Sequence, residues 1–166
     1  MQSVQFLQFL LFHLGQDRYG LRTRDLVRVL PLMALKQLPQ APAYIAGLMN
    51  LRGVPVPVID INLLACNQRC SQQFDSRILL TEFPCTDGSR HLLGLMVERV
   101  SHIAAFDPSM FIAPGVTNAA APYLGEVVAA DGAIVQLVEL AQLLSAQVQA
   151  LLFTPAAQAP AQELPC

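Results

Sequence analysis

Charged residues are scarce in this 166-residue chain: they make up 13% of it, whereas hydrophobic residues make up 54%. Typical globular proteins are about 25% charged and about 45–50% apolar. The apolar surplus has two interpretations of equal weight. Either the chain is a β protein with a large core, or part of the surplus forms a surface patch where a partner docks. The length suits one domain or two small subdomains that share a core.

Basic stretches are also missing. Lys36 is the single lysine, the nine arginines are spread along the chain, and the net charge is −2. A nucleic-acid-binding protein needs a basic stripe that displaces counterions from phosphates, so we expect no nucleic-acid partner. Arginine suits bidentate and stacked contacts, which is a weak indication of a protein interface.

Targeting and membrane-spanning segments are not recognisable. The apolar run near the N-terminus has no positively charged region before it and no small-residue cleavage site after it. The longest uncharged window, residues 140–162, contains five glutamines and two prolines, which makes it too polar to span a bilayer. We therefore expect a cytoplasmic protein without direct membrane insertion.

Catalytic and metal-binding motifs are absent as well. No HExxH motif, Walker loop, GxGxxG motif or nucleophile elbow occurs, and the three histidines, His13, His91 and His102, lie apart in strand-like segments. We therefore expect no enzyme and no cofactor. An active site can be assembled from distant residues, so a small ligand-binding β-barrel or an enzyme with a site between subdomains remains the alternative.

The cysteines do not form a metal-binding pattern. Cys66 and Cys70 are four residues apart, which would place both thiols on one face of a helix, but no second pair of ligands follows at a matching spacing. We expect no metal and reduced thiols, as is usual in the cytoplasm. The remaining cysteines are Cys85 and Cys166.

What is present is a series of short strands. Apolar, β-branched and alternating runs predict strands at residues 6–14, 19–21, 25–30, 54–59, 76–83, 91–100, 102–106, 123–130 and 133–138. Asp87-Gly88 and Asp131-Gly132 are typical of hairpin turns. The pattern predicts an all-β protein built from small barrels or a sandwich, with a natural division near residues 67–75.

Helices are expected at three places. Residues 44–49 place apolar side chains at helical spacing and predict a short mid-chain helix. Asp60 is a candidate N-cap for a second short helix over residues 61–66. An apolar stripe predicts a C-terminal helix over residues 139–153. Residues 154–166 are rich in Pro, Ala and Gln and are expected to form a disordered tail.

Several short motifs occur in an order that resembles one known family. They are Tyr19-Gly20-Leu21, Asp25 to Val29, Tyr44-Ile45-x-Gly47-Leu48, Asn50-Leu51-Arg52-Gly53, Pro57-Val58-Ile59-Asp60, Gly94 to Val100, Tyr123-Leu124-Gly125 and Val138-Glu139-Leu140. Over residues 6–146 the chain resembles the CheW-like coupling proteins of bacterial chemosensory arrays. The Asn-Leu-Arg-Gly and Pro-Val-Ile-Asp motifs are the most specific.

The resemblance implies a single domain over residues 1–153, made of two intertwined five-stranded SH3-like β-barrels with a groove between them. It implies a non-catalytic adaptor that couples the cytoplasmic tip of a chemoreceptor to the regulatory domain of a CheA-type histidine kinase. The residues that would face the receptor by position are Leu26, Arg28, Val29, Asn50, Arg52 and Gly53. Apolar residues at the barrel ends would face the kinase.

The sequence departs from the family pattern at Arg28, where an acidic residue that pairs with the motif arginine is common. Two arginines about 4 Å apart would repel by about 4 kcal/mol at an effective dielectric constant of about 20. Either a carboxylate of the partner lies between Arg28 and Arg52, or Arg28 points into solvent. Together with Val138-Glu139 in place of an apolar-Asp pair, this departure favours an alternative chemosensory system, such as a Wsp-like surface-sensing pathway.

Overall fold

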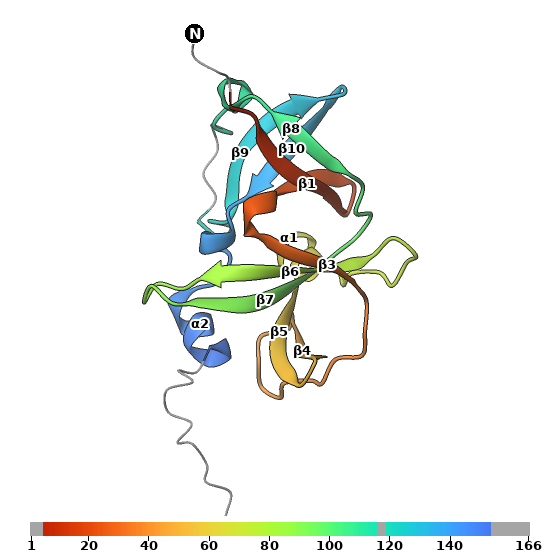
Figure 1. The fold of residues 1–166 in the computed structure, drawn as a ribbon, viewed down its shortest axis with the longest axis vertical. Helices are drawn as coiled ribbons and strands as arrows, with labels where there is room; N and C mark the ends of the chain where they lie inside the picture. Colours follow the sequence, from red (N-terminus) through yellow and green to blue (C-terminus); the bar gives the residue numbers. More distant parts are fainter. Residues whose placement is uncertain (1–4, 116–118, 154–166) are drawn as a thin grey trace, which may run out of the picture.

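The computed structural model describes residues 5–115 and 119–153, and within them the chain forms two five-stranded sheets (Figure 1). The first sheet has the order β8-β1-β2-β10-β9, and its strands are β8 (Ile103–Phe106), β1 (Leu7–Leu14), β2 (Asp17–Arg22), β10 (Ala133–Val138) and β9 (Leu124–Ala130). The second has the order β3-β6-β7-β5-β4, and its strands are β3 (Leu26–Pro31), β6 (Arg77–Pro84), β7 (Arg90–Val97), β5 (Val54–Asp60) and β4 (Ile45–Leu51).

Each sheet closes on itself through the segment that follows one edge strand. In the first sheet, Ile112 comes after β8 and forms a bridge with Val127 on β9. In the second, Lys36 comes after β3 and forms a bridge with Leu48 on β4. Closure removes most of the exposed strand edge and gives two small barrels. The expected all-β architecture of two five-stranded subdomains is confirmed.

The core has three parts, one inside each barrel and one between them. Strand β1 shows how they are connected, because its side chains alternate between two buried faces. Phe9 and Leu11 pack inside the first barrel, whereas Phe12 belongs to the shared core, which also contains Ile59 and Leu95 of the second barrel. Burying a large apolar side chain contributes about 1.5–3 kcal/mol, so the shared core binds the barrels firmly to each other.

The sequence suggested a division between the barrels near residues 67–75. The structure places the division elsewhere. This segment connects the helix α1 (Ile61–Cys66) to β6, and the strands on both sides of it, β5 and β6, belong to the same sheet. The second barrel takes the continuous stretch from β3 to β7, and the first combines strands from both ends of the chain. Spacing along the sequence does not reveal such pairing between distant strands.

The helix expected at residues 44–49 is wrong, because Tyr44 lies in a turn and residues 45–49 lie in β4. Burial alternates along the strand, with Ile45, Gly47 and Met49 pointing inward. Gly47 has φ of 146°, and a Cβ at this position would lie 2.5 Å from the carbonyl oxygen of Lys36. The close approach of the Lys36 backbone, which closes the barrel, therefore requires glycine and favours the extended conformation.

The C-terminal helix is shorter than expected. A 3-10 turn at Leu140–Gln142 is followed by α2 (Ala146–Leu152), and the break lies at Ser145. The hydroxyl group of Ser145 accepts a hydrogen bond from the backbone N–H of Val148, which starts a new helix instead of continuing the old one. Residues 154–166, for which a disordered tail was expected, lie outside the described residues.

The short helix after Asp60 is confirmed. The Asp60 carboxylate accepts a hydrogen bond from Leu63 N at 3.0 Å and begins α1. The two prolines before it lie at the entrance of β5. Pro55 and Pro57 pair with β4 on one side, and on the other side β5 begins to pair with β7 only at Val58. The missing N–H groups therefore leave no gap in a ladder.

Candidate functional site

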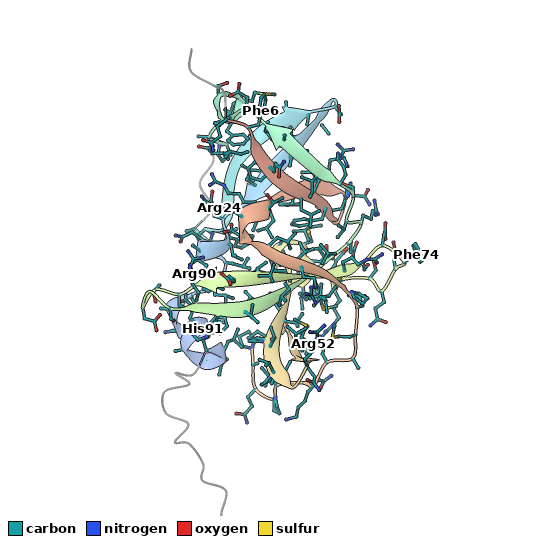
Figure 2. All side chains as sticks on the ribbon, viewed as in Figure 1. Phe6, Arg24, Arg52, Phe74, Arg90 and His91 are labelled. Carbon is teal, nitrogen blue, oxygen red and sulfur yellow. The ribbon has the colours of Figure 1, made fainter. Side chains whose placement is uncertain are left out.

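The Asn-Leu-Arg-Gly motif forms the turn between β4 and β5. Leu51 pairs with Val54, so Arg52 and Gly53 are the two loop residues, with φ of 51° and 87°. Two central residues with positive φ are the signature of a type I′ hairpin turn. The side-chain oxygen of Asn50 accepts a hydrogen bond from Gly53 N at 2.7 Å, which holds the turn closed. The guanidinium group of Arg52 is thus presented to solvent on a rigid tip (Figure 2).

The other predicted site residues lie on β3, at the opposite end of the strand order. Leu26 is half-buried and packs against the shared core, whereas Arg28 and Val29 are exposed. A β-bulge between Leu26 and Arg28 disturbs the alternation, so Val27 is exposed too. The strand therefore presents three consecutive side chains to solvent instead of every second one.

The structure places all six predicted residues on the second barrel, in two groups. The turn group, Asn50, Arg52 and Gly53, is joined by its own hydrogen bond. The second group lies on β3. This strand shares an interior core with β4, since Leu30 and Met49 belong to one buried cluster. Within the described residues, the ion pairs involve Arg24 and Arg90, and neither Arg28 nor Arg52. Both arginines are free to meet an external carboxylate.

Two hollows border the turn. One, of about 330 Å³, is lined by Lys36, Leu48, Met49, Asn50, Gly53 and Pro55. The other, of about 640 Å³, runs between the Pro55–Pro57 side of β5, the beginning of β7 and the end of α2, and is mainly apolar. In the second hollow the ring of Phe153 stacks on His91, with the ring centres 4.8 Å apart. Both hollows are lined mainly by apolar side chains.

The three cysteines in the described residues have raised pKa values. The pKa of the Cys70 thiol is raised to about 12, mainly by burial and then by the nearby Asp60 and Glu98 carboxylates. Burial likewise raises the pKa of the Cys66 and Cys85 thiols. A thiol with a raised pKa stays protonated at neutral pH and is a poor nucleophile. Cys66, Cys70 and Cys85 form no disulfide within the described residues.

The sequence reasoning missed a network of buried polar side chains around the end of β5 that lies away from the turn. Asp60 also accepts a hydrogen bond from Cys70 N at 2.9 Å, and Glu98 accepts one from Ser71 N at 2.8 Å. Asn62 donates to the carbonyl group of Gln68 at 2.8 Å. These bonds fix the loop between α1 and β6, whose exposed tip carries Phe74 (Figure 2). No short motif predicts such a network, because its members are far apart in sequence.

The described residues were compared with what a metal site and a membrane-spanning helix require. No group of three or more His, Cys, Asp or Glu side chains is arranged there to hold a metal ion. None of the helices in residues 5–115 and 119–153 combines the length and apolarity that crossing a membrane requires.

Known proteins resemble this chain over most of its length. The CheW-like domain family matches residues 8–148. The chain is 28% identical to the chemotaxis protein CheW of Klebsiella aerogenes over 150 residues, covering 87% of this chain and 85% of the relative. It is 22% identical to the chemotaxis protein CheW of Treponema pallidum over 154 residues, covering 84% of this chain and 83% of that relative.

A solved structure leads to the same family. The crystal structure of the scaffolding protein TtCheW from Thermoanaerobacter tengcongensis superimposes with a TM-score of 0.75 and 25% sequence identity, over 87% of this chain and 91% of that one. It shares the mostly β architecture of two subdomains. The family match, the two relatives and the shared fold agree with the motifs around the β4–β5 turn: the chain belongs to the CheW-like family.

Proposed function

We propose that this protein is a non-catalytic cytoplasmic adaptor that couples the tip of a chemoreceptor to a CheA-type histidine kinase in a chemosensory array. Its family and the scaffolding role named for its structural neighbour support this role. The observation that carries the proposal is the β4–β5 turn, which holds an unpaired arginine on a rigid tip. A preorganised arginine loses little conformational entropy on binding and is a frequent binding hot spot.

The receptor-facing surface in this proposal consists of Leu26, Arg28, Val29, Asn50, Arg52 and Gly53. The hollow beside the turn supports it, since it gives an apolar side chain of the receptor a place next to the cations. The kinase-facing surface is assigned to the first barrel, where Ile103, Ile112 and Ile134 are more than half exposed. Exposed apolar residues in such numbers are typical of an interface core.

The experiment measures binding of the purified cytoplasmic hairpin of the cognate receptor, and of the regulatory domain of the cognate kinase, by titration calorimetry. We expect both to bind. Arg52→Ala should weaken receptor binding by about tenfold or more, as is typical for a hot-spot arginine, and leave kinase binding unchanged. Asp131→Ala is the matched control, because Asp131 has the same place in the equivalent turn of the first barrel, with φ of 51°.

Binding to neither partner would refute the adaptor function. Receptor binding that Arg52→Ala and Asp131→Ala leave equally strong would refute the assignment of the turn to the receptor. A folded-state check by near-UV circular dichroism accompanies each variant. Both side chains are exposed, and substitutions at such positions usually change stability by less than about 0.5 kcal/mol.

A further inference from the structure

Acidic residues are missing from one long stretch of the chain. Between Asp25 and Asp60 no Asp or Glu occurs, whereas the stretch contains three cations, Arg28, Lys36 and Arg52. The chain as a whole has a net charge of −2. The stretch is therefore positive in a protein that is negative overall, and it lies entirely within the second barrel.

The fold brings the three cations to one wall of that barrel. Arg28 lies on the edge strand β3, Lys36 forms the bridge that closes β3 onto β4, and Arg52 is at the tip of the β4–β5 turn. All three are exposed, and the ion pairs of the described residues do not include them. Lys36 lines the same hollow as the turn residues Asn50 and Gly53. The stretch itself contains no Asp or Glu that could neutralise these three cations.

Apolar side chains lie between the cations. Val27 is 50% exposed, Val29 is 39% exposed and Val54 is 53% exposed. The first two flank Arg28 on β3, and the third follows the turn that carries Arg52. Exposed valines alternating with unpaired cations match a partner surface on which apolar side chains are flanked by carboxylates, because buried apolar area adds affinity and opposite charges steer the encounter.

The edge of β3 is not shaped to accept an added strand. The bulge at Val27 interrupts its ladder and Pro31 ends it, and cations on edge strands discourage strand pairing. Contact through side chains is therefore favoured over contact through the backbone. An amphipathic helix supplies this kind of partner, since residues three and four positions apart share one face.

We propose that the wall formed by β3, the Lys36 bridge and the β4–β5 turn docks an acidic amphipathic helix, whose carboxylates meet Arg28, Lys36 and Arg52. This inference rests on the proposed function, in which that helix belongs to the receptor tip, and it specifies the charge of the tip. The presence of Arg28 then has a physical reason: it is an additional cation for the partner, not an uncompensated neighbour of Arg52.

The test is a titration of the purified cytoplasmic hairpin of the cognate receptor into the full chain at two salt concentrations. Between about 50 mM and about 300 mM NaCl we expect the affinity to fall by about tenfold, because salt screens exposed charges. Arg28→Glu should weaken binding at low salt by about tenfold or more, and Arg28→Gln by less. Arg69→Glu is the matched control, because Arg69 is exposed on the loop between α1 and β6, outside the acid-free stretch.

The outcomes separate the two proposals. A wild-type chain that binds the hairpin equally well at both salt concentrations, with Arg28→Glu and Arg69→Glu equivalent, would overturn the acidic-helix inference and leave the adaptor function standing. A wild-type chain that does not bind the hairpin at either concentration would overturn both. If Arg28→Glu impairs folding, the comparison of Arg28→Gln with wild type at low salt decides the question, because the amide removes the charge without reversing it.

Discussion

The β4–β5 and β9–β10 hairpins are two versions of one structure. Both have a two-residue turn whose first residue, Arg52 or Asp131, has φ of 51° and whose second is glycine. At the base of each, a residue at or directly after the end of the second strand donates its N–H to a tyrosine carbonyl group at 2.7 Å: Asp60, the last residue of β5, to Tyr44, and Glu139, which follows β10, to Tyr123. Each second strand also pairs in parallel with a strand of its own barrel.

The side chains of the two hairpins differ where their backbones agree. The first turn is fastened by Asn50, whereas Ala129 is at the equivalent place in the second. Asp60 is buried and holds two backbone N–H groups, whereas Glu139 is exposed and begins its 3-10 turn without a side-chain cap. The comparison shows that strand order and a Gly turn are enough to form the hairpin. The first hairpin differs in its additional polar groups, which form hydrogen bonds at its turn and at its base.

The largest contrast is expected at the two bases. Asp60→Ala removes an N-cap and leaves the N–H groups of Leu63 and Cys70 without their acceptor, which should lower the free energy of unfolding by about 3 kcal/mol. Glu139→Ala removes an exposed side chain and should change it by less than about 0.5 kcal/mol. Urea denaturation measures both. Equal losses would show that the buried network is not what distinguishes the hairpins.

The second-largest effect is expected at alkaline pH, which should lower the stability of the region around the first hairpin. The folded state raises the pKa of Cys70 from 9.0 to about 12, mainly by burial and then through Asp60 and Glu98. The stability that comes from keeping this thiol neutral is complete below pH 9.0 and is lost as the pH rises towards 12. Thermal denaturation across this window should show a steeper fall of Tm for wild type than for Cys70→Ala. Parallel curves would contradict the burial of a neutral thiol there.

Much of this architecture was predictable from local patterns. Strand alternation, Asp-Gly turns and the Asp60 cap depend on neighbouring residues, and each of these led to the observed element. Strand β4 was not predictable, because the extended conformation at Gly47 depends on the backbone of Lys36, which approaches from another segment. The predicted boundary between the barrels was wrong for the same reason, because β2 and β10 pair across more than a hundred residues.

The candidate site followed a similar rule. The turn at Arg52 depends on near neighbours in the sequence, because glycine at position 53 readily adopts positive φ and the Asn50 side chain accepts a hydrogen bond from Gly53 N. The exposure of Val27 was not evident, because a bulge in the pairing with β6 causes it. Glu98 was missed because its partner, Ser71, is 27 residues away. Sequence motifs therefore located the tip of the site, and pairing between strands determined which side chains surround it.

The two turn glycines should respond alike. Gly53 has φ of 87° and Gly132 has φ of 74°, and a Cβ at either position would meet no atom within 4 Å. Substitution by alanine therefore costs only the backbone strain of a left-handed residue, about 1–2 kcal/mol in each hairpin. Urea denaturation of Gly53→Ala and Gly132→Ala measures the two losses. A difference between them larger than about 1 kcal/mol would show that the backbones are not equivalent.

The smallest effect tests what the Asn50 fastening contributes. Asn50→Ala makes the first turn like the second and removes one exposed hydrogen bond, which should lower the free energy of unfolding by about 0.5–1 kcal/mol. Ala129→Asn, the reciprocal change, should raise it by a few tenths of a kcal/mol at most, because that hairpin forms without the bond. Backbone amide exchange at Gly53 is the sharper measurement. Faster exchange in Asn50→Ala would show that the bond keeps the tip closed, whereas unchanged exchange would mean that the positive-φ turn alone holds Arg52 in place.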